Sequence, residues 1–128
     1  MDKTLESFLH PHRKPNVKFR LPAFDGEFEM RELTVDEMSK INKEAAEKKW
    51  AYFDILNHYA AEALVTPDLH NAQLQDALSD KAGHKIISVY DAYRTLFTGP
   101  ESTKITGKFV DIANLSITFN EKIETAKN

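Results

Sequence analysis

The stretch Tyr52–Leu78, YFDILNHYAAEALVTPDLHNAQLQDAL, decides how the rest of the chain is organised. Apolar residues recur at helical spacing in its first half, which predicts a core helix over residues 51–65. Pro67 ends this helix, because proline cannot continue it. Asp68 or Asn71 can then cap a second, shorter helix whose leucines point inward. The segments on either side must pack against these two helices.

Residues 17–33 change to the two-residue period of β-strands. Apolar and charged residues alternate on both sides of Asp25-Gly26, a dipeptide typical of a tight hairpin turn because glycine tolerates positive φ. The pairs predicted to face each other are Leu21 with Met30 and Ala23 with Phe28. Because a lone hairpin is marginal in water, its apolar face must cover the helices or a partner.

An unpaired strand edge is a ready template for another strand, so edges are either protected or used. We therefore expect self-association or partner binding through residues 17–21 or 28–33. An aromatic run at residues 50–53 is either a recognition patch or part of the core. The side chains singled out for protein interaction are Val17, Phe19, Leu21, Phe28, Met30, Trp50 and Tyr52.

Before the hairpin, residues 1–15 carry a small apolar cluster at helical spacing, and two prolines end it. This predicts one or two helical turns, or an arm that docks through Phe8; a partly ordered terminus is the alternative. After the hairpin, Thr34 and Glu37 match a capping box that opens a polar outer helix reaching about Lys49.

The C-terminal half predicts more helix. Residues 79–83 read as a loop, and helices follow from about His84 to Phe97 and from Glu101 to about Thr125. The β-prone residues 116–119 allow a break in the last helix. The chain is therefore predicted to be one mainly helical α+β domain over residues 1–128, with an N-terminal arm (1–15) and a β-hairpin (17–33), followed by about five helices in a helical region (34–125).

Composition excludes several classes of function. The 128 residues contain no cysteine and carry a net charge of −3, with basic residues spread along the chain. We therefore expect no nucleic-acid partner, and no apolar run is long enough for a membrane span. The absence of a signal-peptide core predicts a cytoplasmic protein.

No sequence motif indicates catalysis or a cofactor. The four glycines are scattered, and no nucleophile motif brings serine, histidine and aspartate together. His10 and His12 flank a proline without a nearby carboxylate, and His58 with Glu62 offers two metal ligands at most. We expect a non-enzymatic protein with no metal or cofactor, and interpret His58 as a histidine at the edge of the core.

Residues 65–75, VTPDLHNAQLQ, resemble the P-D-L-x-N-A-E-L-Q segment of a family of tail assembly chaperones from phages and prophages of Gram-positive bacteria. The upstream order of an extended region, a polar helix and a helix leading into this segment is also similar. Residues 98–101, TGPE, are similar to the family's P-G-E turn with proline and glycine exchanged. Residues 80–88 and the segment after Asn114 depart from the family pattern.

This resemblance implies a protein of the bacterial host cytoplasm that binds the tape measure protein during tail morphogenesis and keeps its hydrophobic helices from aggregating. It also implies recruitment of tail tube protein, often through a longer, frameshifted form. Two alternatives stay open: a structural tail or connector subunit that remains in the virion, and a small cytosolic adaptor unrelated to phages.

Overall fold

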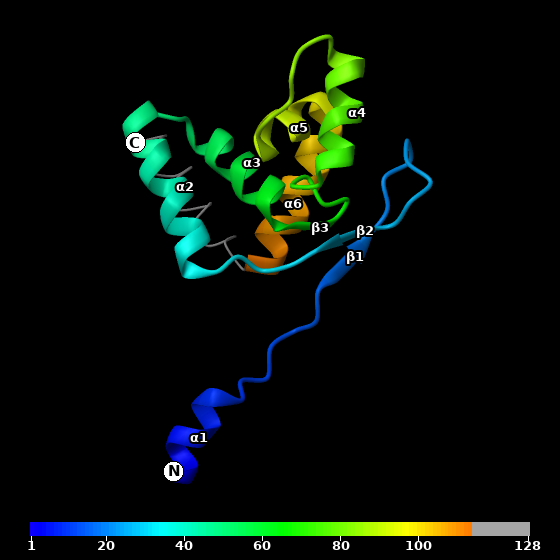
Figure 1. The fold of residues 1–128 in the computed structure, drawn as a ribbon. Helices are drawn as coiled ribbons and strands as arrows, with labels where there is room; N and C mark the ends of the chain where they lie inside the picture. Colours follow the sequence, from blue (N-terminus) through cyan, green and yellow to red (C-terminus); the bar gives the residue numbers. More distant parts are fainter. Residues whose placement is uncertain (114–128) are drawn as a thin grey trace, which may run out of the picture.

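The computed structural model describes residues 1–113 and shows the mainly helical α+β fold that the sequence predicts (Figure 1). The described residues form six helices and one three-stranded antiparallel sheet. The helices are α1 (Lys3–Leu9), α2 (Val35–Lys48), α3 (Tyr52–Ala63), α4 (Ala72–Ala82), α5 (Val89–Leu96) and α6 (Gly99–Ala113). The strands are β1 (Val17–Phe19), β2 (Phe28–Met30) and β3 (Leu64–Thr66). The rest of the last predicted helix, with the break expected at 116–119, lies outside the described residues.

The third strand corrects the prediction that the core helix continues to residue 65. Helix α3 ends at Ala63, and the next three residues pair with β2, so the strand order is β1-β2-β3. The backbone N–H of Arg31 donates to the carbonyl of Ala63 at 3.0 Å and extends this pairing. A short apolar run fits a buried strand as well as a helix, and here the unpaired edge of β2 decides the outcome.

The hairpin forms, but with a wider loop than predicted. Val17 pairs with Met30 and Phe19 with Phe28, so the connection spans residues 20–27 instead of a two-residue turn. Pro22 cannot donate to a ladder, and the chain turns there instead, with the N–H of Phe24 bonded to the carbonyl of Leu21 at 3.1 Å.

Phe24 explains why the wide loop is stable. Its ring packs edge-on against Phe28 and against Phe97, with ring centroids 5.4 and 5.7 Å apart. The register differs from the predicted one by an even number of residues, so the same face of the hairpin is buried. The buried side chains of this face are Phe19, Leu21, Phe28 and Met30.

Helix termini follow the predicted capping chemistry. Thr34 and Glu37 form the complete capping box at the start of α2, and the Asn71 side chain accepts from the Leu74 N–H at the start of α4. The loop predicted at residues 79–83 is wrong: α4 continues to Ala82. It stops at Gly83, whose φ of 77° lies in the left-handed region that glycine tolerates.

The later helices begin where side-chain caps allow them. Helix α5 starts after Ser88, later than predicted, because the Ser88 hydroxyl accepts from the N–H of Asp91. Thr98 and Glu101 cap each other's backbone N–H and open α6 in the predicted place.

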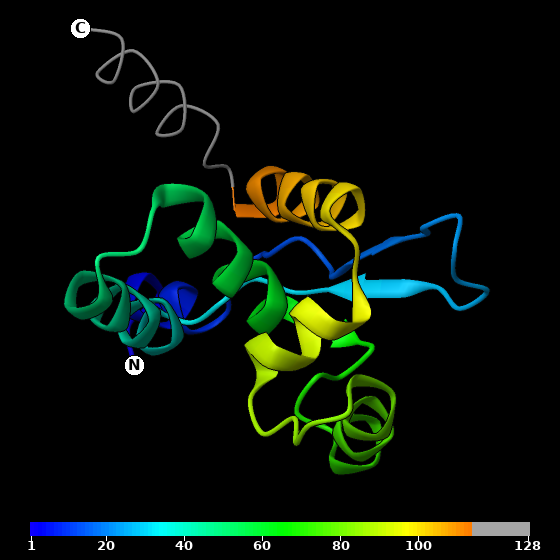
Figure 2. The ribbon, with the colours of Figure 1, turned by 90° about the horizontal axis from the view of Figure 1, so that it is seen from above.

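The core lies between the sheet and helices α3, α5 and α6, which sit on the same side of the sheet (Figures 1 and 2). Helix α3 packs most extensively on α6. The largest fully buried side chains are Phe109, Met30, Leu69 and Ile105. None of the helices within residues 1–113 is long and apolar enough to cross a membrane.

Candidate functional site

Most of the side chains predicted to bind partners belong to the core of the chain itself. Phe19, Leu21, Phe28 and Met30 are buried, because the apolar face of the hairpin covers the helices rather than a partner. Val17, Trp50 and Tyr52 are half-buried and remain partly accessible.

The order of the strands decides which of the two predicted strand edges, residues 17–21 or 28–33, is open to a partner. β2 is the central strand and pairs on both sides, so the expectation that residues 28–33 offer an open edge is wrong. β1 is an outer strand. Binding through residues 17–21 stays a prediction.

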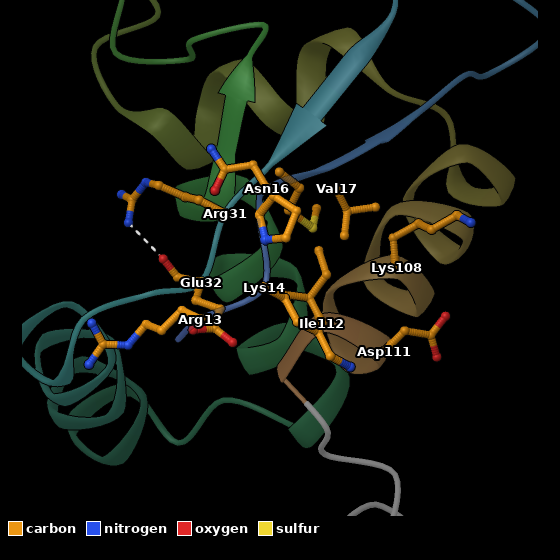
Figure 3. Close-up of a pocket in the computed structure, with 11 residues that line it drawn as sticks. Arg13, Lys14, Asn16, Val17, Arg31, Glu32, Lys108, Asp111 and Ile112 are labelled. Atoms are coloured by element: carbon orange, nitrogen blue, oxygen red, sulfur yellow. Dashed lines mark hydrogen bonds between the residues drawn. The ribbon is translucent and has the colours of Figure 1, made fainter. Parts of the chain in front are cut away.

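A hollow of about 540 Å³ lies beside the start of β1 (Figure 3). Three segments enclose it: the end of the N-terminal arm, the end of β2 and the last turns of α6. Asn16 and Val17 lie on one side, and Lys108 and Asp111 on the other. Its lining combines apolar surface with several basic side chains, which suits a polar, extended ligand better than a purely apolar one.

A second surface is built around His58 on α3. The imidazole is stacked between Trp50 and Tyr90, with ring centroids 3.7 and 3.6 Å away. Lys48 lies 5.8 Å from the Trp50 ring, and Arg94 lies 5.9 Å from the Tyr90 ring, so a cation covers each end of the stack. The stack therefore joins the α2–α3 connection, α3 and α5, and it borders a hollow of about 370 Å³.

Burial within this stack lowers the pKa of His58. Its Nδ1 lies 2.8 Å from the carbonyl oxygen of Asp54, to which it donates. That bond and the nearby carboxylates of Glu44 and Asp54 raise the pKa, while Lys48 lowers it, but desolvation is the largest effect. The structure thus favours the neutral imidazole.

We expect acid to weaken this stack. The pKa of His58 is lower in the folded chain than in the unfolded one, so its contribution is complete above about pH 6.5 and declines as the pH falls towards the folded pKa. His58→Phe keeps a ring in the stack but removes the titration. Urea unfolding between about pH 7.5 and about pH 5 should show the wild-type protein losing stability relative to this variant. A constant difference between the two proteins over this range would contradict the expectation.

The segment that carries the family resemblance is well ordered by local hydrogen bonds. Asp68 accepts from the N–H of His70, and the Gln75 amide donates to the carbonyl of Leu69 at 2.8 Å. Glu62 lies 3.0 Å from His70, whereas His58 is stacked on Trp50, so the hydrogen bond of Glu62 goes to His70. No group of three or more potential metal ligands exists among residues 1–113.

The N-terminal helix carries the most exposed apolar cluster. Leu5, Phe8 and Leu9 are 58%, 77% and 61% exposed, and α1 contains no buried residue. The arm stands away from the helical body (Figure 1). The expectation that it docks through Phe8 is therefore wrong, and its apolar face is available to a partner.

Trp50 and His58 were noted separately in the sequence, but their stacking with Tyr90 could not be predicted, because Tyr90 is distant from both in the chain. The apolar face of α1 could be predicted from the sequence, since Leu5, Phe8 and Leu9 have helical spacing. Comparison with protein-family models, curated proteins and solved structures finds no match to this chain.

Proposed function

We propose that this protein is a phage tail assembly chaperone that binds the tape measure protein and helps to recruit tail tube protein. The resemblance of residues 65–75 to the chaperone family suggests the activity. The observation that carries the proposal is the exposed apolar face of α1. A chaperone for long hydrophobic helices needs an apolar surface that its own core does not use.

The geometry of α1 suits helix binding. Leu5, Phe8 and Leu9 lie on one face because they are three and four positions apart. Asp2 caps the helix by accepting from the N–H groups of Thr4 and Leu5, which supports the short helix without help from the core. An amphipathic helix of this kind can pack along a hydrophobic helix of a partner.

Coexpression with a phage tape measure protein from the same genome tests the function. We expect the wild-type chain to keep the tape measure protein soluble and to copurify with it. Phe8→Asp places a charge in the apolar face and should remove most of the soluble complex, because burying an unpaired carboxylate is costly. The matched control is Ile87→Asp, which changes an apolar residue that is 71% exposed on the helical body.

The outcomes separate the alternatives. Unchanged solubility of the tape measure protein on coexpression with the wild-type chain would contradict the chaperone function. Equal loss from Phe8→Asp and Ile87→Asp would contradict the role of α1. Mass spectrometry of purified virions should find no copies of the chain, whereas a structural tail or connector subunit would be retained.

A further inference from the structure

The hollow beside the arm continues along β1 as a trough. A second hollow, of about 310 Å³, lies next to residues 19–21 and the middle of α6. Both hollows are lined by Lys108 and Asp111, so they meet at the same turn of α6. We call the two together the β1–α6 trough. It follows the chain from Arg13 to Leu21.

One wall of the trough is formed by β1, which is an outer strand of the sheet. β1 pairs only with β2 among the described strands, and the residues of an antiparallel strand alternately direct their backbone N–H and C=O towards and away from the partner. No backbone hydrogen bond from elsewhere in residues 1–113 reaches β1. Its outward backbone groups can therefore receive one more strand.

The trough is positively charged although the whole chain carries a net charge of −3. Its basic residues are Arg13, Lys14, Arg20, Arg31, Lys104 and Lys108, and its acidic residues are Glu32 and Asp111. Arg31 is neutralised by Glu37 at 2.6 Å, and Arg20 lies 4.0 Å from Glu27. The other four basic side chains make no ion pair within the part of the chain that the structure describes.

Apolar side chains line the same trough between these charges. The accessible ones are Pro15, Val17 and Ile112, whereas Phe19, Leu21 and Met30 border the trough but are buried in the core. An occupant must therefore offer apolar groups to this lining and negative charge to the lysines and arginines. Because successive side chains of a strand point to opposite faces, an extended segment with alternating apolar and acidic residues meets both needs.

We propose that the β1–α6 trough binds an extended segment of a partner protein, in which apolar and acidic residues alternate, as a fourth strand on β1. The strand edge supplies backbone hydrogen bonds, and the positive charge selects an acidic segment. This inference does not rest on the chaperone function, which uses α1 and a helical partner.

A labelled peptide of about eight residues that alternates glutamate and valine serves as the probe. Fluorescence anisotropy with the full-length protein should show saturable binding that weakens several-fold between about 0.05 M and about 0.5 M NaCl, since the attraction is partly ionic. Lys108→Glu should weaken binding about fivefold or more, because it replaces an attraction shared by both hollows with a repulsion. The matched control is Lys43→Glu, which makes the same charge change on an exposed lysine of α2 and should leave binding unchanged.

Two modified peptides test the charge and the strand geometry separately. A lysine–valine peptide should not bind. N-methylation of alternate residues along one edge of the glutamate–valine peptide should abolish binding, because the backbone donors are removed while the side chains stay.

The proposal is overturned if the glutamate–valine peptide does not bind, if the N-methylated peptide binds equally well, or if Lys108→Glu and Lys43→Glu behave alike. Displacement of the peptide by an equal concentration of single-stranded oligothymidylate would show a general anion site and would also overturn it. So would an apparent Kd that rises with protein concentration, because a second copy of the chain would then occupy the trough. These results leave the tape measure experiment unaffected, so the two proposals fail independently.

Discussion

Phe109→Ala is expected to lower the free energy of unfolding by about 3–5 kcal/mol, a large fraction of the stability of a domain of this size. Phe109 is only 2% exposed and stacks on Tyr59 of α3 with ring centroids 5.5 Å apart. The Tyr59 hydroxyl in turn donates to Asn42 of α2. Removing the Phe109 ring leaves a cavity where α6 closes over α3, and it loosens the support of α2 through the same tyrosine.

Urea unfolding followed by circular dichroism measures this loss, with Phe8→Ala as the matched control. Phe8 is 77% exposed on α1, so the same chemical change should cost no more than about 1 kcal/mol. A loss below about 1.5 kcal/mol for Phe109→Ala, with an unchanged dependence on urea, would contradict the role of α6 in closing the core.

Local chemistry made much of this fold predictable. The caps at Thr34 and Asn71 bond to backbone N–H groups three residues ahead, so the start of α2 could be predicted and that of α4 was limited to Asp68 or Asn71. The buried face of the hairpin was also predictable, because the alternation of residues 17–33 survives any even change of register.

The errors arose where distant contacts outweigh local preference. Asp25-Gly26 favours a tight turn, but Phe24 gains more by packing on Phe97, which no local pattern reveals. Residues 64–66 are too short a segment for their sequence to distinguish helix from strand. Pairing with the open edge of β2, about 35 residues earlier, makes them a strand.

The candidate sites also differ in how far they can be predicted from the sequence. The apolar face of α1 can be predicted from the spacing of its residues, whereas only the structure shows that α1 stands away from the helical body. The β1–α6 trough joins basic residues from the arm and from α6 that are about ninety positions apart. Charge along the sequence looks evenly spread, and only folding concentrates it on one side of β1.

The second large effect is expected at Arg31 and Glu37, which join the end of β2 to the start of α2. The guanidinium binds the carboxylate through two hydrogen bonds, of 2.8 and 2.6 Å, and it also reaches the carbonyl of Glu62 at 3.5 Å. The hydrogen bond from Arg31, helped by the backbone of Thr34, lowers the pKa of Glu37 to about 2. A paired arginine and carboxylate of this geometry is among the stronger polar interactions in proteins.

Glu37→Gln should therefore lower the free energy of unfolding by about 1–2 kcal/mol near neutral pH, because both side chains are partly exposed and solvent screens the pair. Glutamine can still cap the Thr34 N–H, so the variant isolates the charge from the capping box. Because the folded pKa of Glu37 is lower than its ordinary value of 4.5, its contribution is complete above pH 4.5 and is lost as the pH falls towards about 2. The stability difference between the wild-type protein and the variant should shrink over that interval.

A double-mutant cycle with Arg31→Met tests whether the ion pair itself is responsible. If the two side chains act mainly on each other, the double variant should be more stable than the sum of the single losses predicts, by about 1–3 kcal/mol at neutral pH, because neither charge is left without its partner. The coupling should fall as Glu37 becomes protonated. Additive losses at neutral pH, or stability profiles of wild type and Glu37→Gln that run parallel down to about pH 2.5, would show that β2 and α2 are joined by backbone and apolar contacts instead.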